Sequence, residues 1–121
     1  MVKRNLWKNS TKTTYKQSKY HNEKVIFDGI KFDSKKEFNR YMELKLLEKA
    51  GKISYLELQK PFVLIDKSKY GRQIVYKADF VYYDNELNKL IVEDVKGVKT
   101  DVYKLKKRLI AEKYDIEIIE T

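Results

Sequence analysis

The sequence predicts an α/β protein in which a mixed central β-sheet is flanked by two helices. Two segments, 34–50 and 101–114, combine helix-capping residues with apolar residues at helical spacing. The chain between them consists of runs of branched and aromatic residues that are typical of strands. A last strand pattern at 116–119 follows the second helix. This order of helix, strands, helix and strand around one sheet defines the α/β class.

The first 22 residues differ from the rest of the chain in charge. They contain six basic residues and no acidic one, and the whole chain has a net charge of +9. We expect residues 1–22 to form a flexible basic arm, with Leu6 and Trp7 available as an anchor, and residues 23–121 to form one domain. A basic arm on a mildly basic body is typical of a nucleic-acid partner, and the alternative is a merely solubilising tail.

A hairpin and a helix are the first predicted elements. Strands at 24–27 and 30–32 are joined by Asp28-Gly29, a dipeptide that favours the tight turn of a β-hairpin. Ser34 caps the helix that follows, and Glu37 stands at the capping-box distance from it.

Strand patterns follow Gly51, the glycine that ends this helix. Pro61 separates the first two strands, and a polar turn at 84–88 connects the last two, which are expected to pair as a hairpin. The last strand is apolar on both faces, as expected for the centre of a sheet. The four expected strands cover residues 53–58, 62–65, 73–83 and 89–95.

A second helix is expected after Gly97, which breaks the preceding strand. Thr100 or Asp101 caps this helix. Its apolar stripe, at i, i+3 and i+7, is formed by Val102, Leu105 and Leu109.

Composition excludes several classes of site. The chain has no cysteine and a single histidine, His21, which excludes disulfides, thiolate metal sites and sites built from paired histidines. No apolar run is long enough to span a membrane, and no signal-peptide pattern opens the chain. We therefore expect a cytoplasmic protein.

Acidic residues and one lysine gather where two expected strands end. Because side chains alternate between the faces of a strand, Asp94 and Lys96 share one face and Glu93 points to the other. If the last two strands pair as a hairpin, Asp79 lies beside Asp94. Neighbouring carboxylates repel unless a proton or cation joins them, and oxygen ligands suit Mg²⁺ or Mn²⁺. The sequence thus predicts a divalent metal site, and the alternative for Asp94 and Lys96 is an exposed ion pair.

This pattern resembles the motif of the PD-(D/E)XK nuclease superfamily. The matching residues are Glu37, Asp79 and Asp94-Val95-Lys96-Gly97, and the order of elements over residues 24–121 resembles the restriction-endonuclease-like core of that superfamily. Ala78 stands where the motif has its proline. More narrowly, the segments 76–83 and 92–98 are similar to a small family encoded by phages and prophages, which in layout resembles phage junction-resolving endonucleases.

The resemblance implies a metal-dependent DNA endonuclease that hydrolyses phosphodiester bonds. Asp79 and Asp94 would bind Mg²⁺ or Mn²⁺ together with the Val95 carbonyl oxygen, and Glu37 would complete the metal shell directly or through water. Lys96 would position or help deprotonate the attacking water and stabilise the developing charge. The narrower resemblance implies branched DNA, such as a Holliday junction in phage recombination or replication, and a homodimer in a bacterial host.

Several basic residues are expected to contact DNA phosphates. They are Lys3, Arg4, Lys8 and Lys12 in the arm, and Lys99, Lys104, Lys107 and Arg108 around the second helix. The alternative for the helix is a solvated charged face, and the alternative role of Glu37 is a helix cap. Two other functions remain open, a non-catalytic DNA-binding module on the same fold and a sequence-specific restriction or transposition nuclease.

Overall fold

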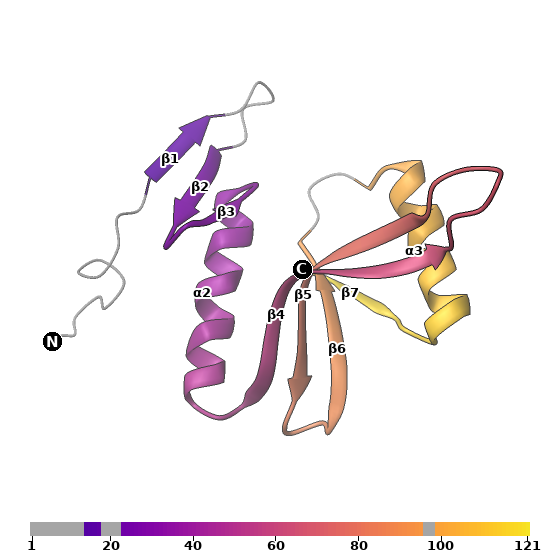
Figure 1. Ribbon diagram of the computed structural model, residues 1–121. Coiled ribbons are helices and arrows are strands. Elements are labelled where there is room, and N and C mark those ends of the chain that lie inside the picture. The colour runs from indigo at the N-terminus through magenta and orange to yellow at the C-terminus, as the bar shows by residue number, and fades with distance from the viewer. Residues whose placement is uncertain (1–13, 18–22, 96–98) are drawn as a thin grey trace, which may run out of the picture. The chain divides into compact units, whose positions relative to one another are not determined.

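The computed structural model describes residues 14–17, 23–95 and 99–121, with side chains in the last two of these ranges. The chain divides into two compact units, the N-terminal unit (Met1–Glu43) and the C-terminal unit (Leu44–Thr121), and each is described by itself (Figure 1). Neither helix among the described residues has the length and apolar character that a membrane span requires.

The N-terminal unit contains a three-stranded antiparallel sheet in the order β1-β2-β3. Strands β2 (Glu23–Phe27) and β3 (Ile30–Phe32) form the expected hairpin, in which Asp28 and Gly29 have φ values of 53° and 76°. Glycine adopts a positive φ without steric cost, and aspartate tolerates it better than most residues. The Asp-Gly turn therefore fits this hairpin, and the prediction is confirmed.

Strand β1 (Thr14–Gln17) lies within the segment for which the sequence predicts a flexible arm. It pairs antiparallel with β2, from Thr14↔Ile26 to Gln17↔Glu23. Four residues without apolar alternation carry little strand signal of their own, so the pairing partner decides the conformation. At these four residues the strand replaces the arm interpretation, and residues 1–13 and 18–22 lie outside the described part of the chain.

Aromatic side chains pack the beginning of α2 (Lys35–Lys49) against the hairpin. The ring centroid of Phe38 lies 5.5 Å from those of both Phe27 and Phe32, and Tyr41 lies 5.0 Å from Phe32. All four side chains are buried. Tilted and edge-on ring pairs at such distances add to the free energy gained from burial alone.

The end of α2 is closed at Gly51, as predicted. Gly51 has a φ of 78°, and the N–H groups of Gly51 and Lys52 donate to the carbonyl oxygens of Glu48 and Leu47 at 3.1 and 2.9 Å. These two hydrogen bonds form a Schellman cap, which satisfies carbonyl groups that the helix leaves without a partner. The first strand of the large sheet begins directly after it.

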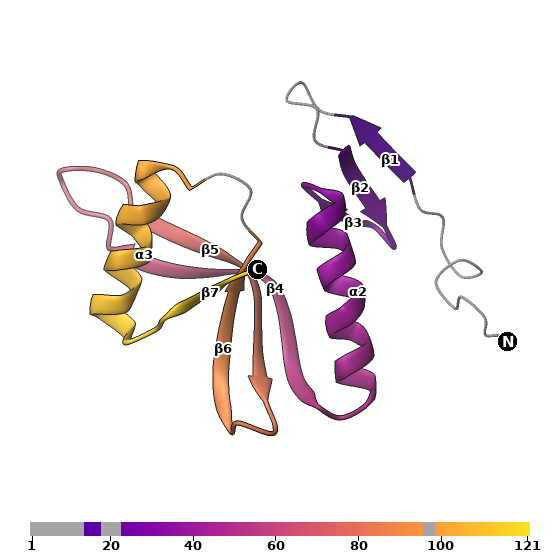
Figure 2. The ribbon, with the colours of Figure 1, turned by 180° about the vertical axis from the view of Figure 1, so that it is seen from behind.

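The C-terminal unit is built on a mixed four-stranded sheet in the order β4-β5-β6-β7 (Figure 1; Figure 2). Neighbouring strands from β4 to β6 are antiparallel, and β6 and β7 are parallel. The strands are β4 (Ile53–Ile65), β5 (Ile74–Asp84), β6 (Lys89–Asp94) and β7 (Ile118–Glu120). The predicted α/β class with a mixed sheet and two helices is confirmed.

Strand β4 is continuous through Pro61, whereas the sequence predicts two strands separated there. Pro61 lies within the ladder opposite Lys77. Proline lacks the N–H that a central strand needs, but an edge strand forms hydrogen bonds on one side only. Since β4 stands at the edge of the sheet order, Pro61 does not end the strand.

Helix α3 (Asp101–Tyr114) packs on the sheet with a different face from the one predicted. Its buried residues are Tyr103 and Ile110, whereas Leu105 is 60% exposed. The predicted apolar stripe is therefore wrong, because only Leu109 packs against the core among Val102, Leu105 and Leu109.

The core beneath α3 draws side chains from every strand of the large sheet. These strand residues are Phe62 and Leu64 on β4, Tyr76, Ala78 and Val81 on β5, Val92 on β6 and Ile118 on β7. Lys106, on the buried side of α3, donates from Nζ to the Val75 carbonyl oxygen at 2.9 Å. The face with Tyr103, Lys106 and Ile110 thus fits the sheet, with a lysine where the sequence pattern favours an apolar residue.

We predict that Ile110→Ala lowers the free energy of unfolding by about 2–5 kcal/mol, because it leaves a cavity under α3. The matched control, Leu105→Ala, removes a side chain of the same size from an exposed position and should change stability by less than about 0.5 kcal/mol. Urea unfolding of the full chain measures both values. Equal losses in the two variants would contradict the assignment of the buried face.

Candidate active site

Two aspartates occupy opposite positions just beyond the last residue pair of the β5–β6 ladder. The ladder ends at Phe80↔Glu93, and the next positions in the same register are Asp79 and Asp94. Oδ2 of Asp79 accepts a hydrogen bond of 2.8 Å from the backbone N–H of Val95, the residue after Asp94. The hairpin on which the sequence prediction depends is present, and it brings the two aspartates together.

Asp94 is held by both neighbouring strands. The residue is 2% exposed, and its Oδ2 accepts a hydrogen bond of 2.5 Å from the hydroxyl group of Tyr76 on β5. Its backbone carbonyl oxygen accepts from the N–H of Thr121, which follows β7, at 3.0 Å. A carboxylate removed from water to this degree needs hydrogen-bond donors or cations around it. Tyr76 supplies one such donor.

Gln59 holds the second aspartate from the edge strand. Its Nε2 donates to Oδ1 of Asp79 at 3.1 Å. Gln59 has a φ of 53°, and the neighbouring pairs Leu58↔Phe80 and Lys60↔Ala78 place it opposite Asp79. Left-handed backbone is unfavourable for a non-glycine residue and is often found at functional sites. Both carboxylate oxygens of Asp79 are thus hydrogen-bonded, one to β4 and one to the end of β6.

The phenol groups of Tyr76 and Tyr103 act as hydrogen-bond donors. Burial raises the pKa of Tyr76 far above its ordinary value of about 10, and the hydrogen bond to Asp94 raises it further. Burial also raises the pKa of Tyr103, whose hydroxyl group donates to Oε2 of Glu120 at 2.7 Å. The charges of Asp79 and Asp94 raise the pKa of both phenols, so the aspartates and tyrosines lie within electrostatic reach of one another.

Glu120 on β7 gathers three donors beside Asp94, its partner in the parallel ladder. Oε1 of Glu120 binds Lys99 Nζ at 2.8 Å, and Oε2 accepts from Tyr103 and from Lys107 Nζ at 3.1 Å. These hydrogen bonds, that of Lys99 first, lower the pKa of the Glu120 carboxyl group to about 2. The carboxylate therefore stays charged at neutral pH and holds two lysines at this end of the sheet.

The four basic residues predicted to contact DNA around α3 have different partners. Lys99 and Lys107 bind Glu120 while their side chains stay 54% and 39% exposed. Arg108 forms an exposed ion pair of 3.4 Å with Glu112, and Lys104 is exposed. An ion pair exposed on both sides, such as that of Arg108 with Glu112, contributes little to stability, so Arg108 can exchange its partner for phosphate at small cost. The arm residues Lys3, Arg4, Lys8 and Lys12 lie outside the described residues.

Glu93, the acidic neighbour of Asp94, is buried and points to the other face of the sheet. Its Oε2 accepts a short hydrogen bond from the hydroxyl group of Tyr82, and its Oε1 lies 3.5 Å from Oγ1 of Thr121. Glu93 pairs across the ladder with Phe80, whereas Asp94 stands opposite Asp79. The alternation of side chains along β6 therefore separates the two acids, as the sequence predicts.

Glu37 closes the beginning of α2. Its N–H donates to Oγ of Ser34 at 3.1 Å, and its Oε1 accepts from the N–H of Asp33 at 3.0 Å. This is a reciprocal cap of the capping-box kind, with the second donor one residue earlier than in the standard motif. The Glu37 residue is also buried, which is unusual for an acid that only caps a helix. Glu37 belongs to the N-terminal unit and is described within it.

Two predicted roles remain predictions. Lys96 lies outside the described residues. Val95 is half-buried and donates its N–H to Asp79, and the use of its carbonyl oxygen as a metal ligand stays an expectation.

The aspartate pair suits a hard divalent cation. Mg²⁺ prefers oxygen ligands, and proteins commonly hold it with one or two carboxylates and several waters. Within residues 23–95 and 99–121, no group of three or more histidine, aspartate or glutamate side chains is arranged to hold a metal ion. Asp79 and Asp94 are two carboxylates, so a cation held by this pair would need water in its other coordination positions.

Sequence reasoning missed four residues at this end of the sheet, two that bind the aspartates (Tyr76 and Gln59) and two that bind each other beside Asp94 (Tyr103 and Glu120). Tyr76 and Tyr103 read as ordinary core aromatics, and Glu120 reads as a polar residue near the end of the chain. Nothing in the local sequence pointed to Gln59. Its role depends on a left-handed backbone conformation, which a glutamine in the sequence does not predict. One clue to Glu120 was available. It follows the apolar Ile118 by two residues, so both side chains lie on the same face of the last strand.

The fold and the site define an α/β protein with paired carboxylates at the end of a β-hairpin. The chain belongs to the family of proteins of unknown function DUF1064, whose model matches residues 17–119. No curated protein and no solved structure shows a significant match to the chain.

We predict a stability contribution from Glu120 that is lost in acid. Because its pKa in the folded protein is about 2 and its ordinary value is 4.5, this contribution is complete above pH 4.5 and disappears as the pH falls toward 2. Comparing thermal melting of the wild type and Glu120→Gln at several pH values isolates this group from other acids. The difference in Tm should be largest near pH 6 and shrink steadily below pH 4.5. A difference independent of pH would contradict the network around Glu120.

Proposed function

We propose that this protein is a metal-dependent endonuclease of the PD-(D/E)XK type that hydrolyses phosphodiester bonds in DNA. Its main support is the placement of Asp79 and Asp94 at opposed strand positions, each oriented by hydrogen-bond donors from neighbouring strands. A pure DNA-binding surface gains nothing from two carboxylates held beside phosphates, since like charges repel. A bound divalent cation removes that repulsion.

Asp79 and Asp94 would hold Mg²⁺ or Mn²⁺, and the bound ion would activate water and neutralise charge on the phosphate. Gln59 and Tyr76 fix the orientation of the two carboxylates through the hydrogen bonds described above. Tyr76 stays protonated at neutral pH, so it acts as a donor and not as a base. Hydrogen bonds that orient carboxylates in this way commonly decide how well the carboxylates bind a metal.

Lys96 follows Asp94 by two residues and is the proposed group for positioning the attacking water and stabilising negative charge. A role for Glu37 beyond its helix cap in the N-terminal unit is an expectation that comes from the superfamily resemblance alone. Lys99 and Lys107, which bind Glu120 next to Asp94, supply positive charge for phosphates near the site. Lys104 and Arg108 extend this charge along α3.

The proposed substrate is branched DNA, a Holliday junction or a related structure, in phage recombination or replication within the bacterial cytoplasm. This part of the proposal derives from the resemblance to phage junction-resolving endonucleases. Two symmetric incisions at a junction require two active sites, so the active form would be a homodimer.

We predict cleavage of DNA that depends on Mg²⁺ or Mn²⁺ and stops with a chelator. Asp79→Asn, Asp94→Asn and Lys96→Ala should lower the cleavage rate by about two orders of magnitude or more, while DNA binding persists. Glu117→Gln is the matched control, since it removes an exposed carboxylate from the same unit and should cleave at the wild-type rate. The substrates are a four-way junction, a flap, a single strand and a linear duplex.

Each pattern of products has one meaning. Cleavage of the junction alone supports the complete proposal. Equal nicking of every substrate would contradict the proposed preference for branched DNA but would still support a nuclease. Binding without a product on any substrate, with either metal, would overturn the nuclease and favour a non-catalytic DNA-binding module.

A further inference from the structure

The connection between β4 and β5 carries a cluster of basic residues that the site above does not use. Residues 66–73, here called the tip, contain Lys67, Lys69 and Arg72 against the single acid Asp66, a net charge of +2. Most of the tip side chains are exposed. Among the described residues neither Lys67 nor Arg72 forms an ion pair, in contrast to Lys60, which pairs with Glu57 on the adjoining strand.

The turn at the end of the tip has a defined conformation. Ser68 and Gly71 exchange two backbone hydrogen bonds, of 3.0 Å and 3.2 Å. Oγ of Ser68 also accepts a hydrogen bond of 3.1 Å from the N–H of Tyr70. These bonds fix the backbone of the turn, including that of Tyr70. The chain therefore loses less conformational entropy when a ligand binds there.

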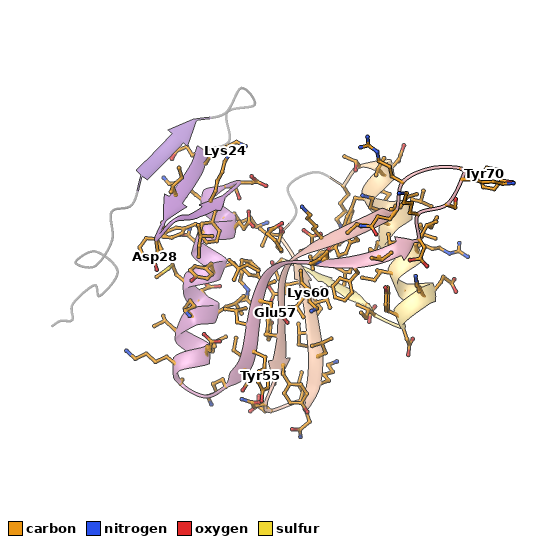
Figure 3. All side chains as sticks on the ribbon, viewed as in Figure 1. Lys24, Asp28, Tyr55, Glu57, Lys60 and Tyr70 are labelled. Atoms are coloured by element: carbon orange, nitrogen blue, oxygen red, sulfur yellow. The ribbon has the colours of Figure 1, made fainter. Side chains whose placement is uncertain are left out.

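Tyr70 stands at the end of this turn and points away from the sheet (Figure 3). It is 87% exposed, so its ring contributes almost nothing to the core. Nζ of Lys69 lies 5.1 Å from the ring centroid. The tip therefore presents an exposed aromatic ring on a hydrogen-bonded turn, next to cations that form no ion pair within the described part of the chain.

We propose that the tip binds nucleic acid at unpaired nucleotides, with Tyr70 stacked on a base and Lys67, Lys69 and Arg72 on the adjacent phosphates. An aromatic ring beside cations is the combination by which proteins bind single strands without reading sequence. A base inside a continuous duplex offers its face to neighbouring bases and not to a protein ring. This inference rests on the nuclease proposed above and names its substrate class, which is DNA with unstacked bases at a branch or in a single strand.

Fluorescence anisotropy with the full chain and a chelator tests this binding without cleavage. The probes are a labelled oligothymidylate, a four-way junction and a linear duplex. Tyr70→Ala should weaken binding to the single strand and the junction by about 5- to 150-fold, the range for losing one stacked base, and change duplex binding less than about twofold. Tyr70→Phe keeps the ring and should bind like the wild type.

The matched control is Tyr55→Ala. Tyr55 is 82% exposed and lies near the start of β4, at the opposite end of that strand from the tip (Figure 3). A second variant replaces Lys67, Lys69 and Arg72 by glutamine. The slope of log affinity against log salt on the single strand should fall by about 2, at about 0.7 for each lost phosphate contact.

The outcomes separate this inference from the nuclease itself. Wild-type affinity in both Tyr70→Ala and the glutamine variant overturns the tip as a binding element and leaves cleavage untouched. Equal weakening by Tyr55→Ala overturns the specific role of Tyr70. Binding that depends on Tyr70 but is equally strong to polyglutamate overturns nucleic acid as the partner. If the wild type cleaves no substrate but the tip variants bind more weakly, the tip is still a binding element and the nuclease proposal is overturned.

Discussion

The arrangement of the C-terminal unit depends on hydrogen bonds to two carboxylates at the end of one β-hairpin, because these bonds offset the loss of contact with water. Asp94 is almost wholly buried, and an uncompensated buried charge costs more than most domains have in total stability. Tyr76 compensates Asp94 from β5, and Gln59 and the N–H of Val95 compensate Asp79. The donors come from β4, from β5 and from the residue after β6. The three-stranded antiparallel part of the sheet is therefore also the frame of the site.

The parallel strand and α3 form a second layer of compensation. Glu120 lies beside Asp94 in the β6–β7 ladder and would add to the negative charge there if it stood alone. Lys99, Tyr103 and Lys107 bind it instead, and two of these donors lie on α3. The helix thus connects the apolar core, through Tyr103, with the charged end of the sheet. The hydrogen bonds from Lys99, Tyr103 and Lys107 are the reason that the pKa of the Glu120 carboxyl group is strongly lowered.

The sequence predicted the parts of this structure that depend on local chemistry. The Asp28-Gly29 turn, the glycine cap at Gly51 and the hairpin that sets Asp79 opposite Asp94 all follow from residue types and spacing. Features that depend on tertiary context were missed. Pro61 remains in a strand because that strand is at an edge, and α3 uses Tyr103 and Ile110 because the sheet selects between two apolar stripes. Gln59 joins the site through a backbone conformation that its side chain does not encode.

Direct observation of a bound ion is the decisive measurement. Titration of Mn²⁺ into the ¹⁵N-labelled full chain, followed by NMR, reports which amide signals the paramagnetic ion broadens first. The signals of Asp79, Asp94 and Val95 should broaden at the lowest concentrations, and Asp79→Asn with Asp94→Asn should abolish this while the protein stays folded. Broadening that begins elsewhere, or that persists in the double variant, would show that the paired aspartates do not hold a metal.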